Sequence, residues 1–160
     1  MFESFFPKPK LFFGSLVLWI IFLITVWYSI GETLGNSLGF SLDTEEQVIG
    51  LGHFITSEFL WFDLFYLFGT LIFYYSWRRY DSHFWQNWSI LGSALLIYLS
   101  YASVQVSVII NAWYGPFYND IQTALGGNGE VTVSQLYGHF IIFCTIAFPY
   151  IAFIIANRFF

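Results

Sequence analysis

Four uninterrupted apolar runs constrain this chain more than any other feature of its sequence. They cover residues 11–30, 59–77, 88–110 and 136–157. A helix needs about 20 apolar residues to cross the hydrocarbon core of a bilayer, and the runs match that length. The runs are continuous and do not alternate with polar residues, which favours helices over the strands of a membrane barrel. The sequence therefore predicts an all-α integral membrane protein with four transmembrane helices.

Composition points the same way. Charged residues make up 9% of the 160 positions and apolar residues 58%, whereas a soluble domain carries about 25% charged residues. The formal net charge of −5 argues against a nucleic-acid partner, because nucleic-acid binders usually present a basic face. The single cysteine, Cys144, lies inside an apolar run. It therefore offers no disulfide framework and no cysteine-based metal site.

The few basic residues predict how the chain is oriented. All five lie on one side of a four-helix arrangement: Lys8, Lys10, Arg78, Arg79 and Arg158. The opposite loops, residues 31–58 and 111–135, contain no Lys or Arg. The positive-inside rule then places the N- and C-termini in the cytoplasm. We expect residues 1–10 to form an interfacial N-terminal segment and residues 11–160 to form the transmembrane domain.

Two capping boxes and one proline refine this picture. Thr44-Glu45-Glu46-Gln47 predicts a short surface helix in the first outer loop, and Thr132 with Gln135 predicts the start of the fourth helix. Pro149 interrupts the fourth run and predicts a kink. The first run is too long for a signal-peptide core and lacks a small-x-small cleavage pattern, so it is expected to remain as an anchor.

The third run carries a stripe of small hydroxyl residues that ends at Asn111. Its members are Ser89, Ser93, Ser100, Ser103 and Ser107. At 100° per residue they share one narrow helix face. That face is interpreted either as a seam where two helices pack or as the wall of a polar cavity. Gln105 lies on nearly the opposite face, and its amide is not expected to face lipid.

Residues 111–125 are dense in aromatic rings and amide side chains. Such a collar is typical of a membrane boundary, where amphipathic rings are favoured. Its candidates for cargo contact, or for fixing the end of the helix, are Asn111, Trp113, Tyr114, Tyr118 and Asp120.

In the second run, Asp63 heads a weaker polar stripe with Tyr66, Thr70 and Tyr74. An acid at that depth is a candidate for proton response, although it could also reach the headgroup layer.

No constellation for catalysis or cofactor binding is visible. The sequence lacks a phosphate-binding loop, a His-Glu-x-x-His motif and a nucleophile with a nearby base, so neither an enzyme nor a nucleotide site is expected. No metal is expected either. The three histidines are His53, His83 and His139. They are interpreted as solvated residues near the interface rather than as haem ligands.

Three sequence blocks resemble the SbmA/BacA family of bacterial inner-membrane peptide transporters. They are MFESFFPKP at residues 1–9, WQNWSILGSAL at residues 85–95, and NAWYGPFY at residues 111–118 followed by IQTAL at residues 121–125. The blocks occur in the order in which the family has them. The resemblance covers essentially the whole chain.

The resemblance implies a multi-pass homodimer in the bacterial inner membrane, with a membrane domain similar to that of ABC exporters but without a nucleotide-binding domain. It implies a secondary active transporter that uses the proton gradient to import peptides, including Pro-rich antimicrobial peptides and microcins. The partners so implied are peptide substrate and membrane lipid, with no nucleotide and no nucleic acid.

Two departures from the family pattern affect these expectations. The chain is a little under half the family's usual length, so an N-terminal fragment that does not transport peptides alone is expected. Some members also carry Glu where this chain has Gln105, which cannot carry a proton. The alternatives are the membrane subunit of an ABC-type permease that needs a separate ATPase, and an assembly factor with no substrate.

Overall fold

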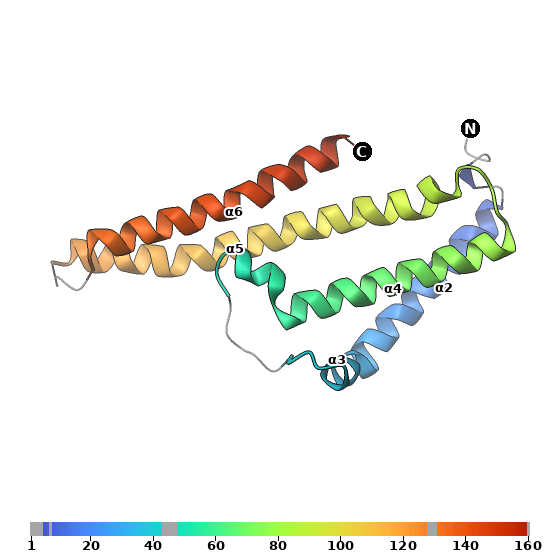
Figure 1. The fold of residues 1–160 in the computed structure, drawn as a ribbon, viewed down its shortest axis with the longest axis horizontal. Coiled ribbons are helices and arrows are strands. Elements are labelled where there is room, and N and C mark those ends of the chain that lie inside the picture. Colours follow the sequence, from blue (N-terminus) through green and yellow to red (C-terminus); the bar gives the residue numbers. More distant parts are fainter. Residues whose placement is uncertain (1–4, 7, 43–47, 128–130, 160) are drawn as a thin grey trace. The chain divides into compact units, whose positions relative to one another are not determined.

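All regular structure in the described part of the chain is helical (Figure 1). The computed structural model describes residues 5–6, 8–42, 48–127 and 131–159. The long helices are α2 (Pro9–Val26), α4 (Ser57–Tyr80), α5 (Ser93–Leu125) and α6 (Val133–Phe159). The shorter elements are α3 (Glu32–Ser37), two π-helical segments (Trp27–Gly31 and Asn87–Gly92) and a 3₁₀ helix (Leu51–Ile55). The predicted all-α class is confirmed.

Four helical stretches are long and apolar enough to cross a membrane. They are Pro9–Ser37, Ser57–Tyr80, Asn87–Leu125 and Val133–Ala156, with 29, 24, 39 and 24 residues respectively. Their number and order agree with the four runs predicted from the sequence. The chain is therefore a membrane protein.

The third stretch, Asn87–Leu125, extends further than the sequence predicted. Residues 111–125 were expected to lie at a boundary beyond a helix that ends at residue 110, but they form the last four turns of α5. The helix passes through Pro116 without ending. At 1.5 Å per residue, 39 residues measure about 58 Å, whereas the hydrocarbon core is about 30 Å thick. A large part of this helix must therefore lie outside the hydrocarbon.

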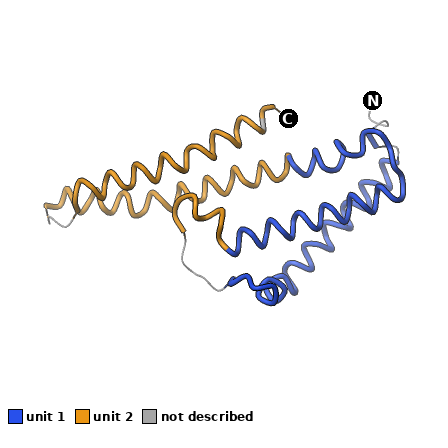
Figure 2. The backbone as a smooth tube through the Cα atoms, in the orientation of Figure 1, with its two compact units in different colours: residues 1–44, 57–95 blue, residues 45–56, 96–160 orange. Residues whose placement is uncertain are grey.

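The chain divides into two compact units (Figure 2). Unit 1 contains α2, α3, α4 and the beginning of α5. Its core residues are Phe12, Phe73, Tyr74, Trp77 and Ile90. Helices α2 and α4 approach each other closely at Gly69, whose carbonyl oxygen accepts a 3.0 Å hydrogen bond from the Trp19 indole.

The polar stripe of α4 joins that helix to the start of the third span within unit 1. The Tyr66 hydroxyl donates to the Ala94 carbonyl oxygen at 2.7 Å, and the Tyr74 hydroxyl donates to Asn87 Oδ1 at 2.7 Å. Arg78 Nη1 in turn donates to the Tyr74 hydroxyl at 2.7 Å. Much of this predicted stripe is therefore interhelical packing.

The N-terminal segment also packs onto unit 1. The carbonyl oxygen of Phe5 lies 2.9 Å from His83 Nε2 and accepts a 2.8 Å hydrogen bond from the Ser89 hydroxyl. Lys8 forms a 3.3 Å salt bridge with Asp81. These contacts hold Phe5 and Lys8 against the connection between α4 and α5.

Unit 2 is built around the antiparallel pair of α5 and α6. Its core residues are Val106, Ile109, Trp113 and Ile146. Ile49 and Phe54 pack against this core, and the ring centroids of Phe54 and Phe153 are 6.2 Å apart. Part of the predicted outer loop is therefore packed rather than fully solvated, because residues 48–56 cover the middle of the helix pair.

The second capping box lies at the start of α6, and Pro149 lies within that helix. The Thr132 backbone N–H donates to Gln135 Oε1 at 2.7 Å, and the Gln135 N–H donates back to Thr132 Oγ1 at 3.4 Å. This confirms the second capping box. The first box, residues 44–47, lies outside the described residues. Pro149 lies inside α6, which continues on both sides of it.

Candidate functional site

Helix α5 has one face packed inside the chain and another face left uncovered. The packed face consists of Leu99, Ala102, Val106, Ile109 and Trp113. The uncovered face includes Ser93, Ser100, Ser107, Asn111, Tyr114 and Tyr118, and the exposed apolar residues Ile97, Val104 and Val108 lie beside them. At 100° per residue the two faces are centred roughly 120° apart. The predicted serine stripe therefore continues along the helix into the aromatic segment.

Most stripe hydroxyls donate hydrogen bonds to their own helix. Ser100, Ser103 and Ser107 donate to the carbonyl oxygens four residues earlier, at 2.9, 2.9 and 3.2 Å. Their protons are used in this way, so the oxygen lone pairs remain available as acceptors. Ser89 differs because it is buried and also bonds Phe5. Ser89 thus belongs to a packing seam, whereas Ser93, Ser100 and Ser107 are exposed.

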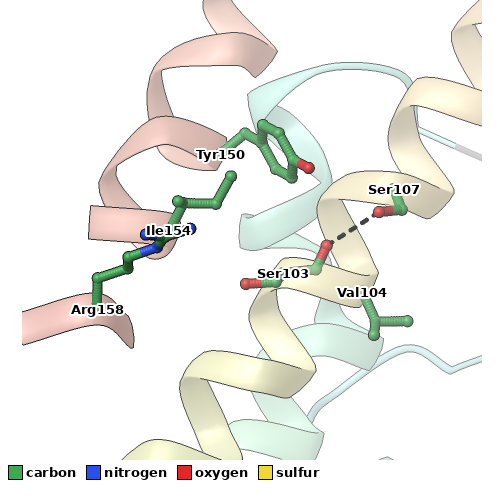
Figure 3. Close-up of a pocket in the computed structure, with 6 residues that line it drawn as sticks. All are labelled: Ser103, Val104, Ser107, Tyr150, Ile154 and Arg158. Carbon is green, nitrogen blue, oxygen red and sulfur yellow. Dashed lines mark hydrogen bonds between the residues drawn. The ribbon is translucent and has the colours of Figure 1, made fainter. Parts of the chain in front are cut away.

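A groove of about 500 Å³ lies between α5 and α6 in unit 2 (Figure 3). It is lined by Ser103, Val104, Ser107, Tyr150, Ile154 and Arg158. In Figure 3 the Tyr150 hydroxyl points toward the two serines on α5. Ser103 and Ser107 thus line this groove, and both interpretations of the whole stripe stay predictions.

The aromatic residues of the collar divide into two groups. Trp113 is buried, its indole donates to the His139 carbonyl oxygen at 2.9 Å, and its ring stacks on Phe117 at 4.5 Å. Tyr114 and Tyr118 are 42% and 52% exposed and stack on each other at 5.7 Å. Trp113 therefore fixes the helix pair, whereas the two tyrosines are accessible to a ligand.

Asp120 has a structural partner that the sequence did not reveal. Its Oδ2 atom lies 2.9 Å from His139 Nε2, across the α5–α6 pair. The two residues are 19 positions apart and belong to different helices, so no local pattern signals the contact. Asn111 is exposed on the uncovered face of α5.

Gln105 is also paired. Its Oε1 atom lies 3.1 Å from His53 Nε2, which belongs to the 3₁₀ helix. The Gln105 amide therefore has a hydrogen-bond partner within unit 2, and its avoidance of lipid stays a prediction. His53 was expected to be solvated, but it is half-buried in unit 2. No signal in the sequence brings these two residues together.

Asp63 belongs to unit 1, where it lies half-buried near the start of α4. Ser89 and Ser93 of the stripe also belong to unit 1, and the remaining candidate residues belong to unit 2. Glu58, one turn earlier on α4, is exposed. Asp63 therefore lies in a different unit from Gln105 and the tyrosine pair.

One family model matches the part of the chain that forms most of these features. Residues 82–160 match the SbmA/BacA-like family. This part of the chain belongs to that family. The matched residues include the whole of α5 and α6, the exposed tyrosine pair and the groove, whereas Asp63 and His53 precede them.

Proposed function

We propose that this chain forms part of a transporter that imports peptides across the bacterial inner membrane, using the proton gradient. The uncovered face of α5 carries the proposal. It combines serine oxygens, the Asn111 amide and a stacked pair of exposed tyrosines. Amide side chains at membrane depth favour water or protein over hydrocarbon. A face of this kind suits the wall of a translocation pathway.

The tyrosine pair suits a peptide cargo. Tyr114 and Tyr118 present flat apolar rings with polar hydroxyls, and their stacking holds both rings in place. Such rings can pack against proline rings while the hydroxyls bond peptide carbonyl groups. Membership of the SbmA/BacA-like family over residues 82–160 supports a peptide substrate. In this proposal the functional unit is a homodimer, and the protein is not an enzyme.

A binding experiment tests the role of this face. The chain is reconstituted in lipid nanodiscs, and binding of a fluorescent Pro-rich peptide is measured by anisotropy. Tyr114→Ala and Tyr118→Ala should each weaken binding about fivefold to tenfold, because each removes an aromatic contact worth about 1 kcal/mol. Tyr137→Ala is the matched control, since this tyrosine is 66% exposed on α6, away from the face. Equal binding by all variants would refute the role of the face.

A second measurement tests the source of energy. Peptide uptake is followed in cells that express a longer family member with the same tyrosine pair. A protonophore at constant ATP should abolish uptake under the proposal. Uptake that persists with the protonophore but stops on ATP depletion would instead indicate the ABC-type permease.

A further inference from the structure

The groove between α5 and α6 has one charged residue on its wall, Arg158 in the last turn of α6. Within the part of the chain that the structure describes, Arg158 forms no ion pair. The exposed side chains of Val104 and Ile154 make the wall beside it apolar. A guanidinium presents paired N–H donors that match the two oxygens of a carboxylate. The groove therefore suits a ligand that ends in a carboxylate and has apolar groups behind it.

The α5 wall of the groove offers hydrogen-bond acceptors. The Ser103 hydroxyl donates to the Leu99 carbonyl oxygen at 2.9 Å, and the Ser107 hydroxyl donates to the Ser103 carbonyl oxygen at 3.2 Å (Figure 3). Each hydroxyl has one proton, so these two oxygens can accept further hydrogen bonds but have no further proton to donate. A ligand on this wall must therefore supply the donors, as the backbone N–H groups of a peptide do.

The spacing of the two serines fits an extended peptide. Ser103 and Ser107 are four residues apart on α5, which corresponds to about 6 Å along the helix. In an extended chain the N–H groups on one edge belong to alternate residues, and they are about 7 Å apart at 3.4 Å per residue. Two N–H groups on one edge of a peptide can therefore reach both serine oxygens.

The antiparallel run of α5 and α6 sets the order of these groups along the groove. The Trp113 indole on α5 donates to the His139 carbonyl oxygen on α6, which places the two residues at one level. Away from this contact, Ser107 comes first, Ser103 second and Arg158 last. At 1.5 Å per residue their backbones lie about 9, 15 and 28 Å from the contact.

The Arg158 side chain shortens the last of these steps. In Figure 3 it extends along α6 toward Ile154, one turn earlier. The Ile154 level is about 22 Å from the Trp113–His139 contact, which is about 7 Å beyond Ser103. Two residues of an extended peptide cover that distance. A carboxylate held by Arg158 therefore leaves the last N–H group of the peptide within reach of Ser103.

From this order we propose that the groove binds the C-terminal end of the peptide cargo. The terminal carboxylate lies against Arg158, and the Tyr150 hydroxyl is a second donor to it. The N–H groups of the last and third-from-last residues donate to Ser103 and Ser107. The groove volume of about 500 Å³ lies within the range of ligand pockets, about 300–1,000 Å³. The inference rests on the proposed peptide transport and adds a requirement for a free C-terminus.

A pair of peptides tests the carboxylate contact. The chain is reconstituted in phosphatidylcholine nanodiscs, whose lipid has no net charge. A Pro-rich peptide labelled at its N-terminus is titrated as the free acid and as the C-terminal amide, and binding is measured by anisotropy. The free acid should bind about tenfold more tightly, because it gains charge-assisted hydrogen bonds. Arg158→Gln should bind both forms equally. Arg79→Gln, the matched control outside the groove, should keep the preference.

Proline placement tests the backbone contacts. Proline has no N–H group, so a peptide that ends in proline cannot donate to Ser103. It should bind severalfold more weakly than a peptide that ends in alanine. Proline at the next-to-last position should leave binding unchanged. Ser103→Ala should weaken the alanine-ending peptide severalfold and leave the proline-ending peptide unaffected. The control Ser100→Ala, on the same helix but outside the groove, should affect neither.

Three outcomes would overturn the proposal. One is equal binding of the free acid and the amide, and another is an equal loss of preference in Arg79→Gln and Arg158→Gln. The third is an equal effect of Ser103→Ala on both peptide endings. The role of the tyrosine pair is separable, because Tyr114→Ala should weaken the acid and the amide alike. If that effect persists while acid and amide bind equally, only the groove inference fails.

Discussion

At the scale of single residues, adjacent aromatic positions on α5 have opposite roles. Trp113 is buried against α6, whereas the next residue, Tyr114, is rotated by 100° and exposed. We expect Trp113→Ala to lower the free energy of unfolding by about 3–5 kcal/mol, because it leaves a cavity and an unbonded His139 carbonyl. Tyr114→Ala should change it by less than about 0.5 kcal/mol. Denaturant unfolding in micelles measures both, and similar losses would contradict the assignment.

The His53–Gln105 hydrogen bond gives a second prediction at this scale. Gln105→Leu should lower the free energy of unfolding by about 0.6–1.7 kcal/mol, the range measured for polar contacts between membrane helices. Gln122→Leu, at an exposed position of the same helix, is the control and should have little effect. If the two variants were equally stable, the bond to His53 would contribute nothing measurable.

At the scale of helices, Gly69 sets how closely α2 and α4 approach. A Cβ atom at this position would lie 2.8 Å from Leu23 Cδ1. Gly69→Val should therefore lower the melting temperature by forcing the helices apart, at a cost of about 1–3 kcal/mol. Gly115→Ala is the matched control, because a Cβ atom there meets nothing within 4 Å. It should be neutral or raise stability by up to about 1 kcal/mol. A melting temperature unchanged by Gly69→Val would show that Leu23 moves aside freely.

The sequence predicted the number of long helices but not where the third one ends. Asn111, Gly115 and Pro116 favour a turn locally, and local preference was a poor guide because Trp113 and Phe117 pack against α6. Tertiary packing stabilises a helix that its own residues do not favour. The capping box at Thr132 was predicted correctly because both partners lie within three residues of each other.

The same limit applies to the candidate site. The serine stripe depends only on helical periodicity, so its shared face could be read from residue spacing. The Asp120–His139 and His53–Gln105 contacts join different elements, and nothing in the sequence determines which residues meet. The groove beside Ser103 and Ser107 likewise depends on Tyr150 and Arg158 of another helix, which residue spacing does not indicate.

At the scale of the whole molecule, the orientation in the membrane remains a prediction of the positive-inside rule. We expect a membrane-impermeant maleimide to label Asn119→Cys from outside intact spheroplasts and to leave Arg79→Cys unlabelled until the cells are opened. Cys144 is exposed and must first be changed to Ser. The reverse labelling pattern would invert the predicted topology and contradict peptide import in the proposed direction.

The division between the two units falls inside α5, between Leu95 and Leu96. One unbroken helix therefore contributes residues to both units. With 33 residues, α5 is about 50 Å long. The π-helical segment Asn87–Gly92 just before it interrupts regular helical bonding, and the Tyr74 hydroxyl on α4 donates to its first residue. A substitution that removes the hydrogen bond between Tyr74 and Asn87 would therefore disturb the start of the same helix that carries the tyrosine pair.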